Sequence, residues 1–205
     1  RVLPGADRMY PDTDSAPSPL EEDYIDKLRA NLPKEVIERY HQLKKWDVPE
    51  DTYTYIFSKN LYPIIEKVVK DLKMDPKLIG TFFGHHLKWV EGHYEKAKEF
   101  RYEQIYDLFS FLRDNDLDVM IAGDMLPEIY EHPKMDFESV LTSINFKRRS
   151  EEEIRNKIEF LKEKFEEIRI SDGKERKVNW VMGEVRPVAL GNLPMKKVRE
   201  IINSK

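Results

Sequence analysis

Apolar residues along this chain recur at helical spacing, and nowhere do they alternate with polar residues for long enough to build a sheet. Residues three and four positions apart share one face of an α-helix, whereas a strand needs a period of two. The stripes before residue 120 run through Tyr24, Leu28 and Leu32; Val36, Ile37, Tyr40 and Leu43; Leu61, Ile64, Ile65, Val68 and Leu72; Leu78, Phe82, Phe83 and Leu87; and Ile105, Leu108, Phe109 and Leu112. The pattern predicts an all-α fold.

The end of the chain continues this pattern. Ser150 and Glu153 form a capping-box pair, which predicts the start of a long helix. Its apolar seam runs through Ile154, Ile158, Leu161, Phe165 and Ile168. A further helix is expected from Val178 until Pro187, then a loop at Gly191–Asn192 and a last helix that carries Met195, Val198, Ile201 and Ile202. The segment 136–146 is also expected to be helical, as is one that Asp75 and Pro76 open.

Proline marks the first segment as different. Residues 1–19 hold four of the twelve prolines, and each proline pushes its predecessor toward an extended conformation. We therefore expect an extended arm over 1–19, with Ser18 and Pro19 at the start of the first helix. The expected organisation is this arm, a helical domain over 20–142 and a small tail domain over 143–205, which makes two helical lobes.

Charge separates the two ends of the chain. The last 59 residues carry 16 Lys/Arg against 11 Asp/Glu, whereas the first 146 carry 19 against 28, within a total net charge of −4. A basic end steers polyanions toward itself. The candidate nucleic-acid-binding residues are Lys147, Arg148, Arg149, Lys174, Arg176, Lys177, Arg186, Lys196, Lys197 and Arg199. Lys147–Arg149 also precede a helix N-terminus, which favours phosphate. The alternative is a solvated surface that only keeps the chain in solution.

Composition excludes several classes of protein. Hydrophobic residues make up 40% of the chain, which argues against disorder throughout, and no apolar run is long enough to span a membrane. The chain has no cysteine, so disulfides and thiol catalysis are excluded and a zinc site is disfavoured. The first residues do not show the pattern of a secretory signal, so we expect a cytoplasmic location. Because the chain begins at Arg1, we expect a fragment or a processed piece.

Catalytic motifs are missing. The sequence has no glycine-rich phosphate loop and no nucleophile elbow, so nucleotide binding within this chain is not expected. His85, His86 and His93 lie close together, but no carboxylate completes a usual metal motif, and ordinary histidines at helix ends explain them better. We place no catalytic residue, metal or cofactor in this chain. Trp180, among the basic residues, can stack on a base, although packing against the core is the commoner role.

Both ends of the chain resemble one family, the B and E subunits of tRNA-dependent amidotransferases. The arm resembles the segment that leaves the catalytic cradle, and its first residues are nearer the archaeal E subunit. The C-terminal end is similar to the tail domain shared with YqeY-type proteins. The motifs that carry the resemblance are Leu3–Pro4–Gly5–Ala6, Arg8–Met9–Tyr10–Pro11–Asp12–Thr13–Asp14 with Ala16–Pro17, Ile25–Asp26–Lys27–Leu28 with Leu32–Pro33, Tyr102–Glu103–Gln104–Ile105 through Leu117, Ala122 and Met125, and Asn179–Trp180–Val181–Met182–Gly183–Glu184–Val185 with Gly191, Pro194 and Val198. One departure is the turn Ala189–Leu193, where the family has a Gly/Lys-rich turn.

The resemblance implies a role for this chain within a larger enzyme. In the parent complex, Glu-tRNA(Gln) is phosphorylated with ATP and magnesium, and ammonia from an amidase partner of the D type then gives Gln-tRNA(Gln). The helical and tail domains hold the body of the tRNA, while the kinase site lies in the cradle. DNA and membranes are not expected partners. The alternative from another class is a helical protein–protein interaction module with no direct RNA contact.

Overall fold

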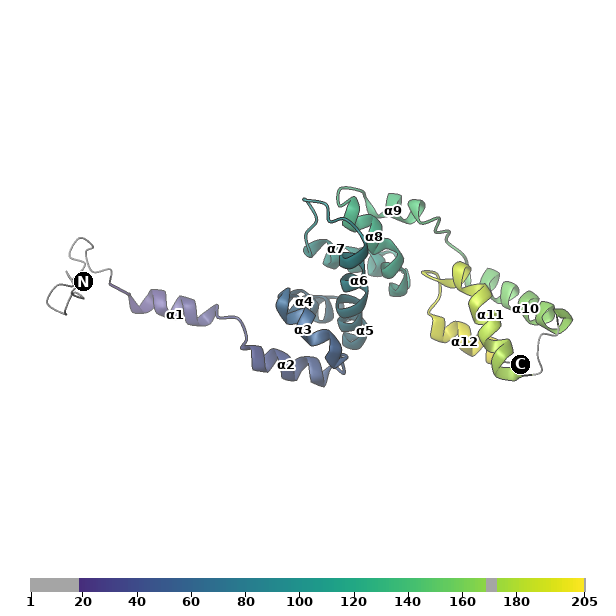
Figure 1. Cartoon of the computed structure of the whole chain (residues 1–205), viewed down its shortest axis with the longest axis horizontal. Helices are drawn as coiled ribbons and strands as arrows, with labels where there is room; N and C mark the ends of the chain where they lie inside the picture. Colours follow the sequence, from purple (N-terminus) through teal and green to yellow (C-terminus); the bar gives the residue numbers. More distant parts are fainter. Residues whose placement is uncertain (1–18, 169–172, 205) are drawn as a thin grey trace, which may run out of the picture. The chain divides into compact units, whose positions relative to one another are not determined.

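The computed structural model describes residues 19–168 and 173–204 (Figure 1). Within these residues every regular element is a helix, which confirms the all-α prediction. The predicted extended arm lies almost wholly outside the described residues, as do Ser18 and the arm motif. The chain divides into two compact units, residues 1–39 and 40–205. The predicted domain boundaries at 19/20 and 142/143 stay predictions.

The first unit carries helix α1 (Glu22–Ala30) and the start of α2 (Val36–Lys45). The predicted helix start at Ser18 and Pro19 is wrong, because α1 begins at Glu22 with Glu21 in an extended conformation before it. The acidic first turn, Glu22 and Asp23, suits the positive end of the helix dipole. No residue of α1 is buried, so its apolar stripe faces solvent.

The middle of the chain, residues 40–146, is here called the central lobe. After the end of α2 it contains η2 (Glu50–Thr52), α3 (Tyr53–Ser58), α4 (Tyr62–Leu72), α5 (Pro76–Thr81), η3 (Phe82–Leu87), α6 (Lys88–His93), α7 (Glu103–Asp114), η4 (Val119–Ile121), α8 (Ala122–Glu131) and α9 (Phe137–Ser143). Its core is rich in aromatic rings, with Phe83, Phe100 and Phe109 fully buried. Helices α4 and α7 pack on one another within it (Figure 1).

Asp75 caps α5 as predicted, since its carboxylate accepts a hydrogen bond from the Leu78 backbone N–H at 2.7 Å. The helix then widens into a π-helical turn at Phe82–Leu87 and continues as α6 through Gly92. Gly84 permits a close approach there, because a Cβ on it would lie 2.3 Å from the Thr52 side chain. A π turn shifts the register of the following residues by about 100°.

The end of the chain forms a second set of packed helices, here called the tail lobe: α10 (Glu151–Ile168), α11 (Lys174–Ala189) and α12 (Met195–Asn203). The capping box is confirmed: the Ser150 N–H donates to Glu153 Oε2 at 2.8 Å, and the Glu153 N–H donates to Ser150 Oγ at 3.2 Å. The predicted end of α11 at Pro187 is wrong. A proline in the last turn removes only one hydrogen bond, and α11 runs on to Ala189.

Gly191, in the loop between α11 and α12, joins the tail lobe to the central lobe. Its carbonyl accepts a hydrogen bond from the Asp118 N–H at 2.8 Å. A Cβ at Gly191 would lie 2.6 Å from Ile121 Cδ1 and 2.8 Å from Phe146 Cε2, and its φ of +81° is one that side-chain-bearing residues rarely adopt. Glycine at this position therefore allows the loop to reach the central lobe.

Candidate nucleic-acid interface

The ten candidate residues lie on three segments of the tail lobe and its approach. Lys147, Arg148 and Arg149 precede α10; Lys174, Arg176, Lys177 and Arg186 lie on α11; and Lys196, Lys197 and Arg199 lie on α12. Lys177 is half-buried and the side chain of Lys174 lies outside the description, whereas the other candidates are exposed. The basic residues thus stand on the surface as a binding role requires.

Asn192 lies in the loop before α12, and its side chain forms hydrogen bonds with the backbone of the segment before α10. Its Oδ1 accepts a hydrogen bond from the Arg149 N–H at 2.9 Å, and its Nδ2 donates to the carbonyls of Lys147 at 2.9 Å and Val188 at 3.0 Å. The Arg148 guanidinium donates to the Asn115 carbonyl of the central lobe at 3.1 Å. These bonds hold the basic segment beside the end of α11, although the two lie far apart in the sequence.

Carboxylates neutralise three of the candidates. Lys177 pairs with Glu166, Lys197 pairs with Glu151, and the Arg149 guanidinium lies 3.2 Å from Glu153. Hydrogen bonds from Lys197 and then Arg155 hold the pKa of Glu151 below its ordinary value. The Ser150 N–H, followed by Arg149, lowers the pKa of Glu153 in the same way. These three cations can contact a phosphate only after their ion pairs with glutamate have broken.

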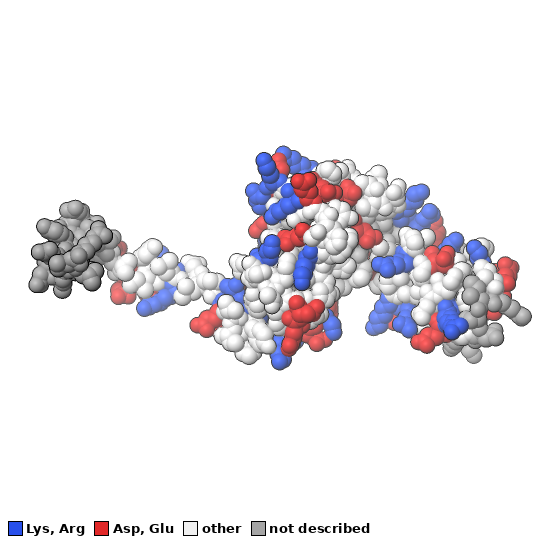
Figure 2. Space-filling model, viewed as in Figure 1, with Lys and Arg blue, Asp and Glu red and all other residues white. Residues whose placement is uncertain are grey.

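Six candidates have no ion pair among the described residues: Lys147, Arg148, Arg176, Arg186, Lys196 and Arg199. On α12, Lys196 and Arg199 are three positions apart and both exposed, while Val198, Ile201 and Ile202 are buried. Figure 2 shows blue and red side chains mixed over the visible face of the tail lobe. The positive charge is therefore distributed over several segments and does not form one unbroken patch in that view.

The N-terminus of α10 is a poor place for phosphate, despite the basic residues before it. The capping box already uses the Glu153 N–H, and the first turn carries three glutamates, Glu151–Glu153. Their negative charge suits the helix dipole and repels an anion. The sequence-based expectation of a phosphate at this helix end has no support in this arrangement.

A groove along α10 contains residues that the sequence analysis missed. It is lined by Arg149, Glu153, Asn156, Lys157, Phe160 and Val188. Phe160 is 53% exposed, and the Lys157 ammonium lies 5.2 Å from the centre of its ring. The signal was present in the sequence, because Phe160 falls outside the helical seam through Ile158 and Leu161.

The three histidines of the central lobe have separate partners. His85 Nε2 lies 2.9 Å from Asp51 Oδ2, His86 stacks on the Phe82 ring with centroids 5.7 Å apart, and His93 Nδ1 lies 2.7 Å from the Trp89 carbonyl. Within residues 19–168 and 173–204, no group of three or more histidine, aspartate or glutamate side chains could hold a metal ion. Trp180 packs against Phe165 with ring centroids 5.5 Å apart, which confirms its packing role.

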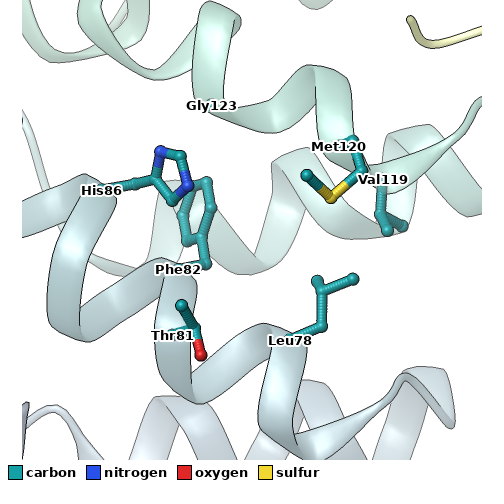
Figure 3. A pocket seen from close by; sticks show the side chains of 7 residues that line it. All are labelled: Leu78, Thr81, Phe82, His86, Val119, Met120 and Gly123. Atoms are coloured by element: carbon teal, nitrogen blue, oxygen red, sulfur yellow. The ribbon is translucent and has the colours of Figure 1, made fainter. Parts of the chain in front are cut away.

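A small pocket of about 160 Å³ lies between α5, η3 and the η4–α8 segment (Figure 3). Leu78, Phe82, Val119 and Met120 make its wall mostly apolar, and His86 and Thr81 supply its polar side-chain groups. With one titratable side chain in its wall, the pocket has no acid–base pair, so it does not suit general acid–base catalysis.

Glu91 is an enclosed charged group of the central lobe, with its side chain 12% exposed. It accepts hydrogen bonds from the Tyr55 hydroxyl at 2.8 Å and the Tyr102 hydroxyl at 2.7 Å, and Lys59 lies at 3.2 Å. Burial alone raises the pKa of Glu91, but the three donors together lower it below its ordinary value. Burial and the same contacts raise the pKa of both tyrosines. The cluster ties α3, α6 and the start of α7 together.

None of the helices over 19–168 and 173–204 is long and apolar enough to cross a membrane.

Known proteins that are similar to this chain are named as amidotransferase subunits. The chain is 25% identical over 208 residues to the E subunit of the glutamyl-tRNA(Gln) amidotransferase of Methanocaldococcus jannaschii, over 100% of this chain and 33% of the relative. It is 25% identical over 183 residues to the B subunit of the aspartyl/glutamyl-tRNA(Asn/Gln) amidotransferase of Sulfolobus acidocaldarius, over 87% of this chain and 39% of the relative.

A bacterial B subunit, that of the aspartyl/glutamyl-tRNA(Asn/Gln) amidotransferase of Thermotoga neapolitana, is 24% identical over 97% of this chain and 43% of its own length. The chain thus spans well under two thirds of these relatives. No solved structure matches it. A family model described as the GatB domain matches residues 64–205, more than half of the sequence, and the chain belongs to that family.

Proposed function

We propose that this chain is the tRNA-binding portion of a Glu-tRNA(Gln) amidotransferase subunit, and that its tail lobe contacts the tRNA backbone. The observation that carries the proposal is the excess of 16 Lys/Arg over 11 Asp/Glu in the last 59 residues of a member of this family. Phosphate contacts dominate the affinity of proteins for nucleic acids, and backbone contacts position a protein without reading sequence. Recognition is then mainly of tRNA shape.

The cations without carboxylate partners carry most of this binding. The exposed candidates that meet phosphate without first breaking an ion pair are Lys147, Arg148, Arg176, Arg186, Lys196 and Arg199. Lys177 and Lys197 also belong to the interface, but Glu166 and Glu151 hold them, so alanine at either position has the smaller effect. The acidic central lobe acts as a spacer between the tail lobe and the catalytic centre.

In the parent complex, ATP and magnesium serve the activation of the glutamyl group, and a D-type amidase partner supplies ammonia. The relatives are named as subunits, which supports an assembly with further chains. We assign the chemistry to parts of the complex other than this chain and place the complex in the cytoplasm. The role of residues 1–205 is to hold tRNA(Gln) in position.

The test is a filter-binding titration of the full chain with tRNA(Gln) and a non-cognate tRNA at several salt concentrations. The variant K147A/K196A/R199A removes three unpaired tail cations. We expect weaker binding and a salt slope reduced by about 2–3 units, because each lost phosphate contact removes about 0.7–0.9.

The matched control is K45A/K88A/K98A, which removes three exposed lysines of the central lobe that have no ion pair among the described residues. Both triple variants change the net charge equally. Unchanged affinity and slope in the tail variant defeat the proposal. An equal loss in the control shows a diffuse effect of charge and defeats the assignment to the tail lobe.

A protein–protein module is the second candidate, and one observation favours it. Tyr24 and Leu28 on α1 are 55% and 51% exposed, with Leu32 and Val36 still more so. Such an apolar stripe commonly meets another protein surface. Salt-insensitive binding to a protein, together with no binding to any tRNA, would favour this candidate over the first.

A further inference from the structure

The groove along α10 combines a flat aromatic ring with charged and amide groups. Phe160 is 53% exposed, whereas Ile154, Ile158 and Leu161 of the same helix are at most 2% exposed. Phe160 does not belong to the second core cluster or to the residues packed against it. The packing of the tail lobe therefore does not account for a phenylalanine at this position.

Phe160 and Val188 are the apolar residues that line the groove, and its charged residues, Arg149, Glu153 and Lys157, carry a net charge of +1. Lys157 places its ammonium 5.2 Å from the ring centre, and Arg149 lines the same groove. Glu153 is the one carboxylate of the lining, and it holds the Arg149 guanidinium at 3.2 Å. Two hydrogen bonds fix the start of the groove, because the capping box orients Glu153 and Asn192 holds the Arg149 backbone. The Arg149 guanidinium can therefore contact a phosphate only after it leaves Glu153, whereas Lys157 has no ion pair among the described residues.

We propose that Phe160 stacks on an unpaired base of the bound RNA, with Lys157 beside a flanking phosphate and the Asn156 amide at the base edge. This proposal rests on the proposed function and adds a contact that is independent of the backbone cations. Unpaired bases stack on aromatic side chains, and cations next to the ring neutralise the phosphates that accompany each base. Because Val188 also lines the groove, an apolar side chain of a protein partner is the alternative that the test has to separate.

The test compares three substitutions at Phe160 in the full chain, with tRNA(Gln) as the probe. F160A is expected to raise Kd about 5- to 150-fold, the range for loss of one stacked base. F160L keeps an apolar side chain without a ring and is expected to lose the same affinity, whereas F160W keeps it. The salt slope stays unchanged in all three, because no charge is removed. Binding of tRNA quenches additional indole fluorescence in F160W relative to the wild-type chain.

W89A is the matched control, since Trp89 on α6 of the central lobe is 51% exposed and its removal leaves tRNA affinity unchanged. A second probe is a blunt RNA duplex without unpaired bases, which the wild-type chain and F160A bind equally. Circular dichroism confirms that each variant is folded.

The outcomes separate this inference from the proposed function. If F160A or F160L binds tRNA as the wild type does, while K147A/K196A/R199A is impaired, the stacking contact is wrong and the proposed function stands. Loss of a protein partner by F160A, with tRNA binding intact, overturns the inference in favour of a protein contact. If the wild-type chain binds no tRNA, both proposals fail.

Discussion

The central lobe and the tail lobe are held together by different kinds of core. The first core cluster contains seven aromatic residues, Tyr53, Tyr62, Phe82, Phe83, Phe100, Phe109 and Tyr130, together with many aliphatic ones. The buried residues of the second cluster are all aliphatic and come from α10, α11, α12 and the loop before α12, with Trp180 packed against them. A large aromatic core supplies more buried area per residue than a small aliphatic one. The central lobe is therefore suited to act as a rigid body, and the tail lobe to display side chains on a modest core.

The two lobes also differ in how far their charged contacts are buried. In the central lobe, Glu91 is enclosed and accepts hydrogen bonds from Tyr55 and Tyr102. The ion pairs of the tail lobe are on the surface, where solvent and salt screen them. The enclosed charge of Glu91 thus serves stability, whereas the exposed ion pairs of the tail lobe contribute little to it.

The largest expected effect is at Phe109 in the central lobe. Its side chain is fully buried and meets the Phe82 ring edge-on, with centroids 4.9 Å apart. Phe109→Ala leaves a cavity and is expected to lower the free energy of unfolding by about 3–5 kcal/mol. Urea denaturation followed by circular dichroism measures the loss.

Phe160→Ala is the matched control, because the same atoms are removed from an exposed position. Phe160→Ala is expected to change the free energy of unfolding by no more than about 0.5 kcal/mol.

Hydrogen exchange of Phe109→Ala then tests whether the two cores are independent. Faster exchange throughout α10–α12, equal to that in α4 and α7, would show one cooperative unit and remove the contrast between the lobes.

The next effect in size is at Glu91. Glu91→Gln removes the charge that Tyr55, Tyr102 and Lys59 stabilise, and we expect a loss of about 1–3 kcal/mol. Because the folded pKa of Glu91 lies below its ordinary value near 4.5, this carboxylate contributes stability above pH 4.5. The contribution disappears as the pH falls through the lowered pKa.

The measurement is the free energy of unfolding from pH 7 down to pH 3. The free energy of unfolding of Glu91→Gln is expected to be lower than that of the wild type at pH 7 and to change less as the pH falls. Glu95→Gln is the control, since Glu95 is exposed and has no ion pair among the described residues. Identical acid dependence in wild type and Glu91→Gln would show that the cluster adds nothing to stability.

Much of this fold could be predicted from the sequence, because local signals agree with the helices that form. The capping box at Ser150 and Glu153, the cap at Asp75 and the stripes of α4 and α7 all appear as predicted. Helix α8 was not predicted as a separate helix, because Ala122 and Met125 were noted only among the residues that carry the family resemblance, and Pro127 lies inside it. The π turn at Phe82–Leu87 has no comparable signal, because tertiary packing against residues such as Thr52 decides it.

The candidate site was less predictable than the fold. Clustered lysines and arginines identify a basic end, but which of them pair with glutamates depends on how α10, α11 and α12 pack. Lys197 and Glu151 are 46 positions apart, and no spacing rule joins them. Phe160, by contrast, could have been found on a helical wheel as the aromatic residue outside the seam of α10.

The smallest expected effect is a change in tRNA affinity when Glu151 is replaced by glutamine. Glu151 binds both Lys197 and Arg155, so Glu151→Gln releases two cations near the unpaired Lys196. We expect tRNA to bind more tightly at low salt, by no more than about fivefold, with a steeper salt slope because each freed cation can contact a phosphate. The melting temperature is not expected to change measurably, since the pairs are exposed.

Glu159→Gln is the control for this gain, because it removes the same charge from α10, where Glu159 is exposed and has no ion pair among the described residues. An equal gain in both variants would mean that net charge alone sets the affinity. A gain in Glu151→Gln alone would mean that ion pairing within the tail lobe holds cations back from the RNA. In that case the surface glutamates tune how strongly the lobe binds, which the enclosed Glu91 of the central lobe cannot do.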